Sequence, residues 1–176
     1  MVYFLFLHSD FFIPGVLLPM LSIRSASAMD ISLLNILIHE FAAFERLPAA
    51  ITEQRLLRDG FGRQPKFRVL LAEWDHEPAG YAFFFDYYSS FEGPAIFLED
   101  IYVRDQYRGK GIGKALLARV AALAHEQGGV ALRWQVLDWN TPAINFYKDL
   151  GADFLDEWKT VNLSGDALRR VASGAQ

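Results

Sequence analysis

The chain contains no cysteine, which excludes a disulfide framework, a thiolate metal site and a cysteine nucleophile. Its four histidines are scattered without metal-ligand spacing, so no metal is expected: His8, His39, His76 and His125. Positive charge is also in short supply, since 17 Lys and Arg face 21 Asp and Glu, a formal net charge of −4. Nucleic-acid backbones are bound by basic faces, so nucleic acid is not expected as a partner.

A long hydrophobic run is missing as well. The first 20 residues are strongly apolar, but Asp10, Pro14 and Pro19 interrupt them, whereas a spanning helix needs ~20 consecutive apolar residues. The segment also lacks the basic start of a signal peptide. Three interpretations remain open: a start codon placed too early with Met20 as the initiator, an additional packing or interfacial segment, and a degenerate signal or membrane anchor. We favour the first and expect a cytoplasmic protein with no membrane partner, residues 1–20 being an extension and 21–176 one domain.

Apolar residues make up 52% of the 176 positions, which is ample for one hydrophobic core. Periodicity and turn signals predict strands at 21–24, 67–73, 79–88, 95–103 and 131–136, with one or two more within 153–163. Helices are expected at 31–45, 52–60, 113–127 and 142–150, with a short one after 164. This order predicts an α/β fold with a mixed, mostly antiparallel sheet of about six to seven strands and helices on both faces. The step from Val103 through a helix to Ala131 should be parallel.

Residues 104–114, Arg-Asp-Gln-Tyr-Arg-Gly-Lys-Gly-Ile-Gly-Lys, are the most informative segment. They join the predicted strand at 95–103 to a helix that begins near Gly113. Glycines let backbone N–H groups approach a ligand closely, and a helix N-terminus attracts phosphate. Three glycines and three mobile cations contribute: Gly109, Gly111, Gly113, Arg108, Lys110 and Lys114. The spacing fits neither a P-loop nor a dinucleotide fingerprint, so the segment predicts a pyrophosphate cradle, the alternative being a plain turn.

With these residues in view, the chain resembles the GNAT superfamily of acyl-CoA N-acetyltransferases over about residues 21–163. The family's Arg/Gln-x-x-Gly-x-Gly/Ala loop corresponds to Arg108, Gly111 and Gly113. A second motif is Asn140 followed by residues 145–152, Asn-Phe-Tyr-Lys-Asp-Leu-Gly-Ala, which is similar to the family's Asn…Phe-Tyr-x-x-x-Gly ending. The resemblance implies the GNAT fold and acetyl-CoA as co-substrate, without a metal.

Three shorter segments, 44–45, 98–103 and 136–140, are similar to the diamine acetyltransferase subgroup of polyamine and thialysine enzymes. Where the polyamine enzymes tend to carry Asp-Pro-Trp, this chain has Ser89-Ser90-Phe91. That departure removes an acidic contact and favours the thialysine-like branch. The resemblance implies a small-molecule primary amine as substrate and a homodimer. The alternatives are a protein lysine or N-terminal acetyltransferase and a non-catalytic acyl-CoA-binding sensor.

Acetyl transfer to an amine needs a proton acceptor, because an amine with a pKa near ~10.4 is protonated at pH 7. By resemblance the general base is Glu99, acting through water, and the general acid toward the coenzyme sulfur is Tyr147. Adjacent strand positions predict that Glu99 and Asp100 face opposite sides, with Glu99 on a largely buried face. A structural carboxylate and a core tyrosine are the competing interpretations.

The binding residues follow from the same comparison. The backbones of Ile101 and Val103 are expected to pair with the pantetheine amides as an added strand would, and to offer donors to the thioester oxygen. The full coenzyme set is Ile101, Tyr102, Val103, Arg108, Gly109, Lys110, Gly111, Ile112, Gly113, Lys114 and Asn140, the last of which could instead serve a turn. The substrate set is Glu45, Asp100, Ser89 and Phe91. Asp100 could alternatively hold the loop, and Glu45 could be a solvated helix-end charge.

Overall fold

A computed structural model describes residues 20–174, so the extension expected at 1–20 lies outside the described residues except for Met20. Contacts within the chain divide it into two compact units that meet in sequence between Gln135 and Val136. The first unit contains the sheet, three helices and the glycine loop. The second contains the two C-terminal helices. Each unit is described by itself.

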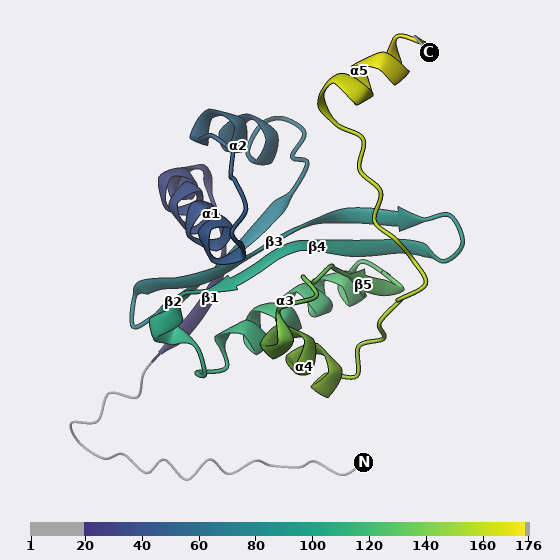
Figure 1. The fold of residues 1–176 in the computed structure, drawn as a ribbon. Helices are drawn as coiled ribbons and strands as arrows, with labels where there is room; N and C mark the ends of the chain where they lie inside the picture. The colour runs from purple at the N-terminus through teal and green to yellow at the C-terminus, as the bar shows by residue number, and fades with distance from the viewer. Residues whose placement is uncertain (1–19, 175–176) are drawn as a thin grey trace, which may run out of the picture. The chain divides into compact units, whose positions relative to one another are not determined.

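The first unit is built on a five-stranded sheet in the order β1-β2-β3-β4-β5. The strands are β1 (Leu21–Ser25), β2 (Arg68–Trp74), β3 (Glu77–Ser89), β4 (Gly93–Val103) and β5 (Ala131–Arg133). Neighbours are antiparallel except β4 and β5, which are parallel. The expected mixed sheet and its parallel step are therefore confirmed, as Figure 1 shows.

The number of strands is lower than expected. No strand forms within residues 153–163 of the described chain, so the sheet has five strands and not six or seven. Alternating apolar residues predict a strand only if an edge and a buried face are available to it. In this segment Trp158 and Val161 are 73% and 90% exposed, so neither side of it is buried.

Helices cover both faces of the sheet in the first unit. Figure 1 shows α1 (Ile31–Glu45) and α2 (Glu53–Gly60) on one face and α3 (Ile112–Glu126) on the other. Their bounds agree with the predicted ranges. Ser27 and Asp30 form the expected capping box on a short 3-10 turn, η1 (Ala28–Asp30), that leads into α1. Thr52 caps α2 by accepting a hydrogen bond from the Arg55 N–H.

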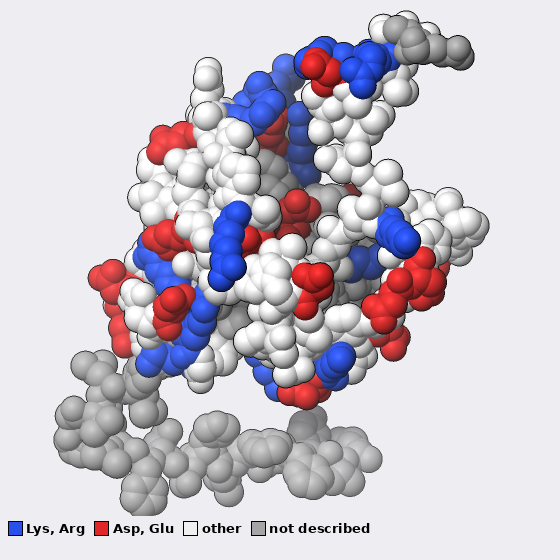
Figure 2. Space-filling model, viewed as in Figure 1, with Lys and Arg blue, Asp and Glu red and all other residues white. Residues whose placement is uncertain are grey.

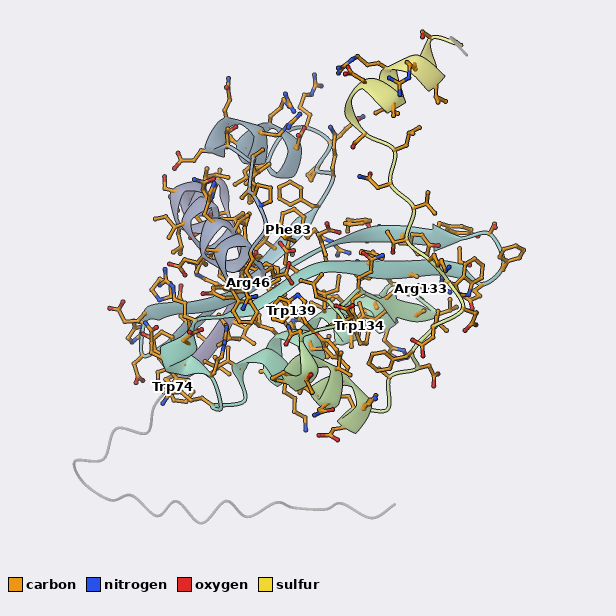
Figure 3. All side chains as sticks on the ribbon, in the orientation of Figure 1. Arg46, Trp74, Phe83, Arg133, Trp134 and Trp139 are labelled. Atoms are coloured by element: carbon orange, nitrogen blue, oxygen red, sulfur yellow. The ribbon has the colours of Figure 1, made fainter. Side chains whose placement is uncertain are left out.

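The core beneath α1 and α2 fixes the position of β3 and β4. It is a contiguous buried cluster of Ile31, Leu34, Leu37, Leu56, Val69, Leu71, Tyr81 and Tyr102. Phe67 and Phe83 stack against it with ring centroids 4.2 Å apart, and Figure 3 shows Phe83 between the sheet and α2. Burial of this size is what holds α1 in place, since a 15-residue helix is marginal on its own.

The second unit contains α4 (Thr141–Asp149) and α5 (Gly165–Ala172). Pro142 occupies the first turn of α4, as its fixed φ predicts. None of the helices between residues 20 and 174 combines the length and apolarity needed to cross a membrane.

Candidate active site

A β-bulge in the middle of β4 shapes the site. Asp100 pairs with Phe83 of β3 and Leu98 pairs with Phe84, which leaves Glu99 as the extra residue between them. Strict alternation of side chains does not hold across such an insertion. Glu99 is exposed, and Asp100 is the more buried of the two carboxyls. The prediction that Glu99 lies on the buried face is therefore wrong, because it assumed an unbroken strand.

Asp100 is held by one hydrogen bond from across the sheet. The Tyr81 hydroxyl donates to Asp100 Oδ2 at 3.0 Å. Burial raises the pKa of Asp100 to about 7, the bond from Tyr81 opposes that rise, and the charges of Glu99 and Glu45 add to it. Asp100 can therefore exchange a proton near neutral pH, which is the property a general base needs.

Tyr81 is fully buried in β3, directly opposite Tyr102 in the strand register. Burial, together with the nearby Asp100 charge, raises the pKa of its phenol well above the ordinary value. The hydroxyl thus stays protonated and remains a donor. Sequence reasoning missed this residue, because Tyr81 is one of several aromatics in β3 and only the β3–β4 register sets it beside Asp100.

Glu45 brings a third carboxyl to the same electrostatic environment. It is the last residue of α1, which ends where Arg46 takes the left-handed conformation. Burial raises the pKa of Glu45, and its charge acts on both Asp100 and Tyr81. Between residues 20 and 174, no basic side chain forms an ion pair with Glu45, Glu99 or Asp100. An unpaired, partly buried acidic cluster is suited to receive a cation.

Beyond the bulge, one edge of β4 is open. β5 pairs only with Ala95–Phe97, so within the described chain no strand lies beside residues 98–103 on that side. The Arg104 N–H donates to Ala79 O of β3 at 2.9 Å. Backbone groups alternate between the two neighbours, so those of Ile101 and Val103 point to the open side. An extended chain with amide groups can add to this edge as a strand does.

The glycine loop needs glycine for its backbone conformation. Gly109 and Gly111 have φ values of 75° and 80°, a left-handed region that other residues enter at a cost. A Cβ at either position would meet no atom within 4 Å, so space is not the constraint. Gly113 does not have a positive φ, and its added Cβ would lie 3.8 Å from Val103 Cγ2.

Six consecutive donors follow from this conformation. The backbone N–H groups of residues 109–114 have no acceptor anywhere in the described part of the chain. They lie at the start of α3, where the first hydrogen bond of the helix runs from the Ala115 N–H to the Gly111 carbonyl. Unpaired amides at a helix N-terminus are a favourable site for phosphate oxygens.

The basic side chains of the loop are less free than expected. Arg108 Nε donates to Val103 O at 3.0 Å, its guanidinium pairs with Asp105 at 2.9 Å, and its Cζ lies 4.6 Å from the centre of the Phe44 ring. Lys110 Nζ lies 5.0 Å from the ring of Trp74, which Figure 3 marks where β2 approaches the turn to β3. Arg108 and Lys110 thus each lie against an aromatic ring, and Arg108 is also bound to Val103 and Asp105.

Together, the open edge and the loop fit one elongated ligand. The edge of β4 ends at Val103, and the donor-rich loop follows it directly. A chain of amides ending in a pyrophosphate, which is the chemistry of coenzyme A, matches this order of sites. The family comparison decides which protein class uses it: residues 32–152 match the sequence model of the Acetyltransferase (GNAT) family.

The chain belongs to the acetyltransferase (GNAT) family. It is 40% identical over 163 residues to mouse (Mus musculus) thialysine N-epsilon-acetyltransferase, covering 85% of this chain and 96% of the relative. It is 32% identical to the L-ornithine N5-acetyltransferase NATA1 of Arabidopsis thaliana, covering 85% and 86% of the two chains. The protein is therefore an acetyl-CoA-dependent N-acetyltransferase.

Solved structures show the same fold. An integron cassette protein from V. cholerae superposes with a TM-score of 0.73 at 24% identity, over 86% of this acetyltransferase and 97% of that chain. An aminoglycoside N-acetyltransferase in complex with CoA has a TM-score of 0.69 at 18% identity, over 88% and 99%. The GNAT architecture predicted from sequence is thus confirmed.

Two expected substrate residues lie far from the acidic cluster of this acetyltransferase. Ser89 is six residues further along β3 than Phe83, which at ~3.3 Å per residue is roughly 20 Å away. The Ser89 hydroxyl accepts the Phe91 N–H at 3.4 Å and so stabilises the β3–β4 turn. Phe91 is 94% exposed. The structure brings Glu45 and Asp100 together but leaves Ser89 and Phe91 at the other end of the hairpin.

The remaining two predicted residues belong to the second unit. Asn140 Oδ1 accepts the Ala143 N–H at 3.3 Å and caps α4, so the local role that sequence analysis left open is present. Tyr147 is buried in α4, with its ring 5.3 Å from that of Phe146. Its catalytic role stays a prediction.

A second feature was missed from sequence. Arg104 binds both carboxylate oxygens of Glu40 at 2.8 Å and also donates to Pro78 O, which ties α1 to the end of β4. An open groove beside this pair is lined by Glu40, Ala43, Phe44, Tyr102, Arg104, Asp105 and Gln106.

Acidic and basic side chains are interspersed on the face shown in Figure 2. In the described chain, no group of three or more potential ligands is placed to hold a metal ion.

Proposed function

We propose that this enzyme transfers an acetyl group from acetyl-CoA to the primary amine of a small molecule, of the lysine-like or diamine class. The observation that carries the proposal is the acidic cluster of Glu45, Glu99 and Asp100, which lacks basic partners among the described residues and adjoins the open edge of β4. An amine substrate is a cation at neutral pH and complements this cluster. Thialysine and ornithine, named for two relatives, both carry such an amine.

Acetyl-CoA would supply the activated thioester. The amides of residues 109–114 would bind its pyrophosphate, and the open-edge backbone of Ile101 and Val103 would pair with its amide arm. Donors along the same edge are suited to the oxygen on which charge develops during attack. Lys114, exposed on the first turn of α3, adds a cation to this end of the site.

Proton removal falls to the two adjacent carboxyls. Asp100, with its pKa near 7, would accept the ammonium hydrogen bond and then the proton. Glu99 is exposed and would pass that proton to water, which differs from the sequence-based prediction that Glu99 itself is the general base acting through water. Tyr147, as a neutral phenol, would protonate the departing thiolate, and Asn140 would contact the coenzyme arm.

The test is thiol release from acetyl-CoA with a panel of acceptors: thialysine, lysine, ornithine, spermidine and a histone-type peptide. We expect the highest kcat/KM with a lysine-like amino acid. Preference for the peptide would instead assign a protein acetyltransferase. Tight acetyl-CoA binding without turnover of any amine would indicate a sensor and overturn the proposal. The proposal includes a cytoplasmic homodimer, which light scattering of the purified protein and localisation of the tagged protein would test.

A further inference from the structure

We propose that Tyr81 is a positioning residue for the acceptor amine, because its hydroxyl binds one oxygen of Asp100 and leaves the other oxygen to receive the ammonium group. The inference rests on the proposed acetylation of amines and adds a residue to it. Tyr81 Oη donates to Asp100 Oδ2 at 3.0 Å, whereas Asp100 Oδ1 has no hydrogen bond within residues 20–174. A carboxylate bound in this way has a fixed orientation and one available acceptor.

The tyrosine itself is rigidly held. Tyr81 has no solvent exposure, and it lies opposite Tyr102 with ring centroids 6.2 Å apart. Phe41 of α1 contacts its ring edge-on at 6.5 Å. The hydroxyl is therefore presented from a packed wall formed by β3, β4 and α1. A donor on such a support keeps its direction when the substrate arrives.

Charges around Asp100 come from each element packed against it. β3 supplies Tyr81, β4 supplies Glu99, and α1 supplies Glu45. Two cations that follow β4 are bound to other carboxylates, since Arg104 binds Glu40 and Arg108 pairs with Asp105. Tyr81 is consequently the one hydrogen-bond donor to the Asp100 side chain in the described chain.

This donor opposes the effect of burial. Burial and the neighbouring carboxylates raise the pKa of Asp100, and the Tyr81 hydrogen bond lowers it. Without the hydroxyl, a larger fraction of Asp100 would be protonated near neutral pH and unable to accept the ammonium. Tyr81 keeps its own proton throughout, because burial and the Asp100 charge raise the pKa of its phenol.

The proton step balances with these groups alone. An N–H bond of the ammonium breaks while an O–H bond forms on Asp100 Oδ1. The electron pair left on nitrogen then forms a C–N bond at the thioester carbonyl while the C–S bond breaks. The thiolate of coenzyme A leaves and is protonated by the equivalent of the second proton that the acylated nitrogen loses. Tyr81 neither gains nor loses a proton, which separates a positioning residue from a catalytic one.

The experiment compares the pH dependence of kcat/KM for wild-type enzyme and Tyr81→Phe, which keeps the buried ring. Loss of a hydrogen bond to a charged group should move the acidic limb upward by about one pH unit. Below that limb kcat/KM should fall about tenfold, and above pH ~9 the two profiles should converge. The matched control is Tyr88→Phe, a 72% exposed tyrosine of the same strand, which should leave the limb in place.

A double-mutant comparison tests whether the effect passes through Asp100. In an Asp100→Asn background, which retains only residual activity, adding Tyr81→Phe should not lower the residual kcat/KM further. A uniform loss at every pH, or an additive loss in the double variant, would overturn the inference and leave Tyr81 a packing residue.

A second measurement does not depend on turnover. Carboxyl 13C NMR should show that the midpoint of the Asp100 titration rises in Tyr81→Phe relative to wild type. If the midpoint of the Asp100 titration is the same in Tyr81→Phe and wild type, the inference is wrong even if amine acetylation is confirmed. If wild-type enzyme acetylates no amine, the proposed function fails, whatever the titration shows.

Discussion

The Nε of Arg108 donates to the backbone oxygen of Val103 at 3.0 Å and thereby ties the glycine loop to the open end of β4. The same guanidinium pairs with Asp105 and lies over the Phe44 ring. Arg108 thus joins the two surfaces that coenzyme A would use, the amide donors of the loop and the edge of the strand. We expect Arg108 to hold the loop in a conformation that can bind coenzyme A before this ligand arrives.

Replacing this guanidinium should weaken acetyl-CoA binding. Arg108→Met keeps the aliphatic stem but removes the bond to Val103 and the pair with Asp105, so we expect about a tenfold rise in Kd, equivalent to ~1.4 kcal/mol. Calorimetry measures it. Arg119→Met, which removes the exposed pair with Glu126 on α3, is the control and should leave Kd unchanged. Equal Kd values for wild type and Arg108→Met would rule out the tether.

Gly111→Ala should cost both stability and affinity. An alanine at φ 80° is strained, which lowers the free energy of unfolding by roughly 1 kcal/mol and displaces the amides of the loop. Gly128→Ala is the matched control, because Gly128 has φ 70° and equally open space but lies at the other end of α3. Both variants should lose stability in urea, and only Gly111→Ala should lose acetyl-CoA affinity. A shared loss of affinity would argue against the cradle.

Asp100 should make the protein less stable at higher pH. Its pKa of about 7 exceeds the unfolded value of 3.8, so between these pH values the folded state keeps a proton that the unfolded state has released. Stability therefore falls as pH rises through that window. At pH 8 the free energy of unfolding of Asp100→Asn should be about 2 kcal/mol higher than that of wild type, although the variant loses activity.

Urea unfolding at pH 4.5 and pH 8 measures this difference. Glu99→Gln is the comparison, because Glu99 is exposed and its replacement should change stability by less than about 0.5 kcal/mol. If Asp100→Asn keeps the wild-type pH dependence, Asp100 is not the buried titrating group.

Glu45 should affect recognition of the substrate and not chemistry. In Glu45→Gln the acidic cluster loses one charge, so KM for a lysine-like amine should rise about fivefold with kcat unchanged. Glu53→Gln, on the exposed first turn of α2, is the control. Steady-state kinetics separate the two constants. A fall in kcat at constant KM would place Glu45 in the proton transfer instead.

Tyr147 is predicted to protonate the departing thiolate of coenzyme A. Tyr147→Phe should lower kcat about 10²-fold and leave acetyl-CoA affinity within twofold of wild type, since general acid help acts only in the transition state. Tyr88→Phe again serves as the control for loss of a phenol. Single-turnover kinetics with unchanged rate would remove Tyr147 from the mechanism.

Most elements of the fold followed from local chemistry. The Ser27–Asp30 capping box, the Thr52 cap and the first-turn Pro142 act within one turn of chain, so their patterns were sufficient to predict them. The backbone conformation of the glycine loop could also be predicted from sequence, because Gly111 has φ 80° and glycine adopts this left-handed region readily. The prediction of strands within 153–163 failed, because a strand forms only beside a partner edge that its own residues do not specify.

The sequence by itself determined the family, the order of helices and strands, and the glycine loop at the start of α3. It could not determine which of Glu99 and Asp100 is buried, because a one-residue bulge in β4 reverses the alternation and is set by pairing with β3. Nor could it select Tyr81 from the aromatics of its strand, since the 3.0 Å bond to Asp100 links residues 19 positions apart. Only the register between two strands decides such a contact, and register is a property of the folded sheet.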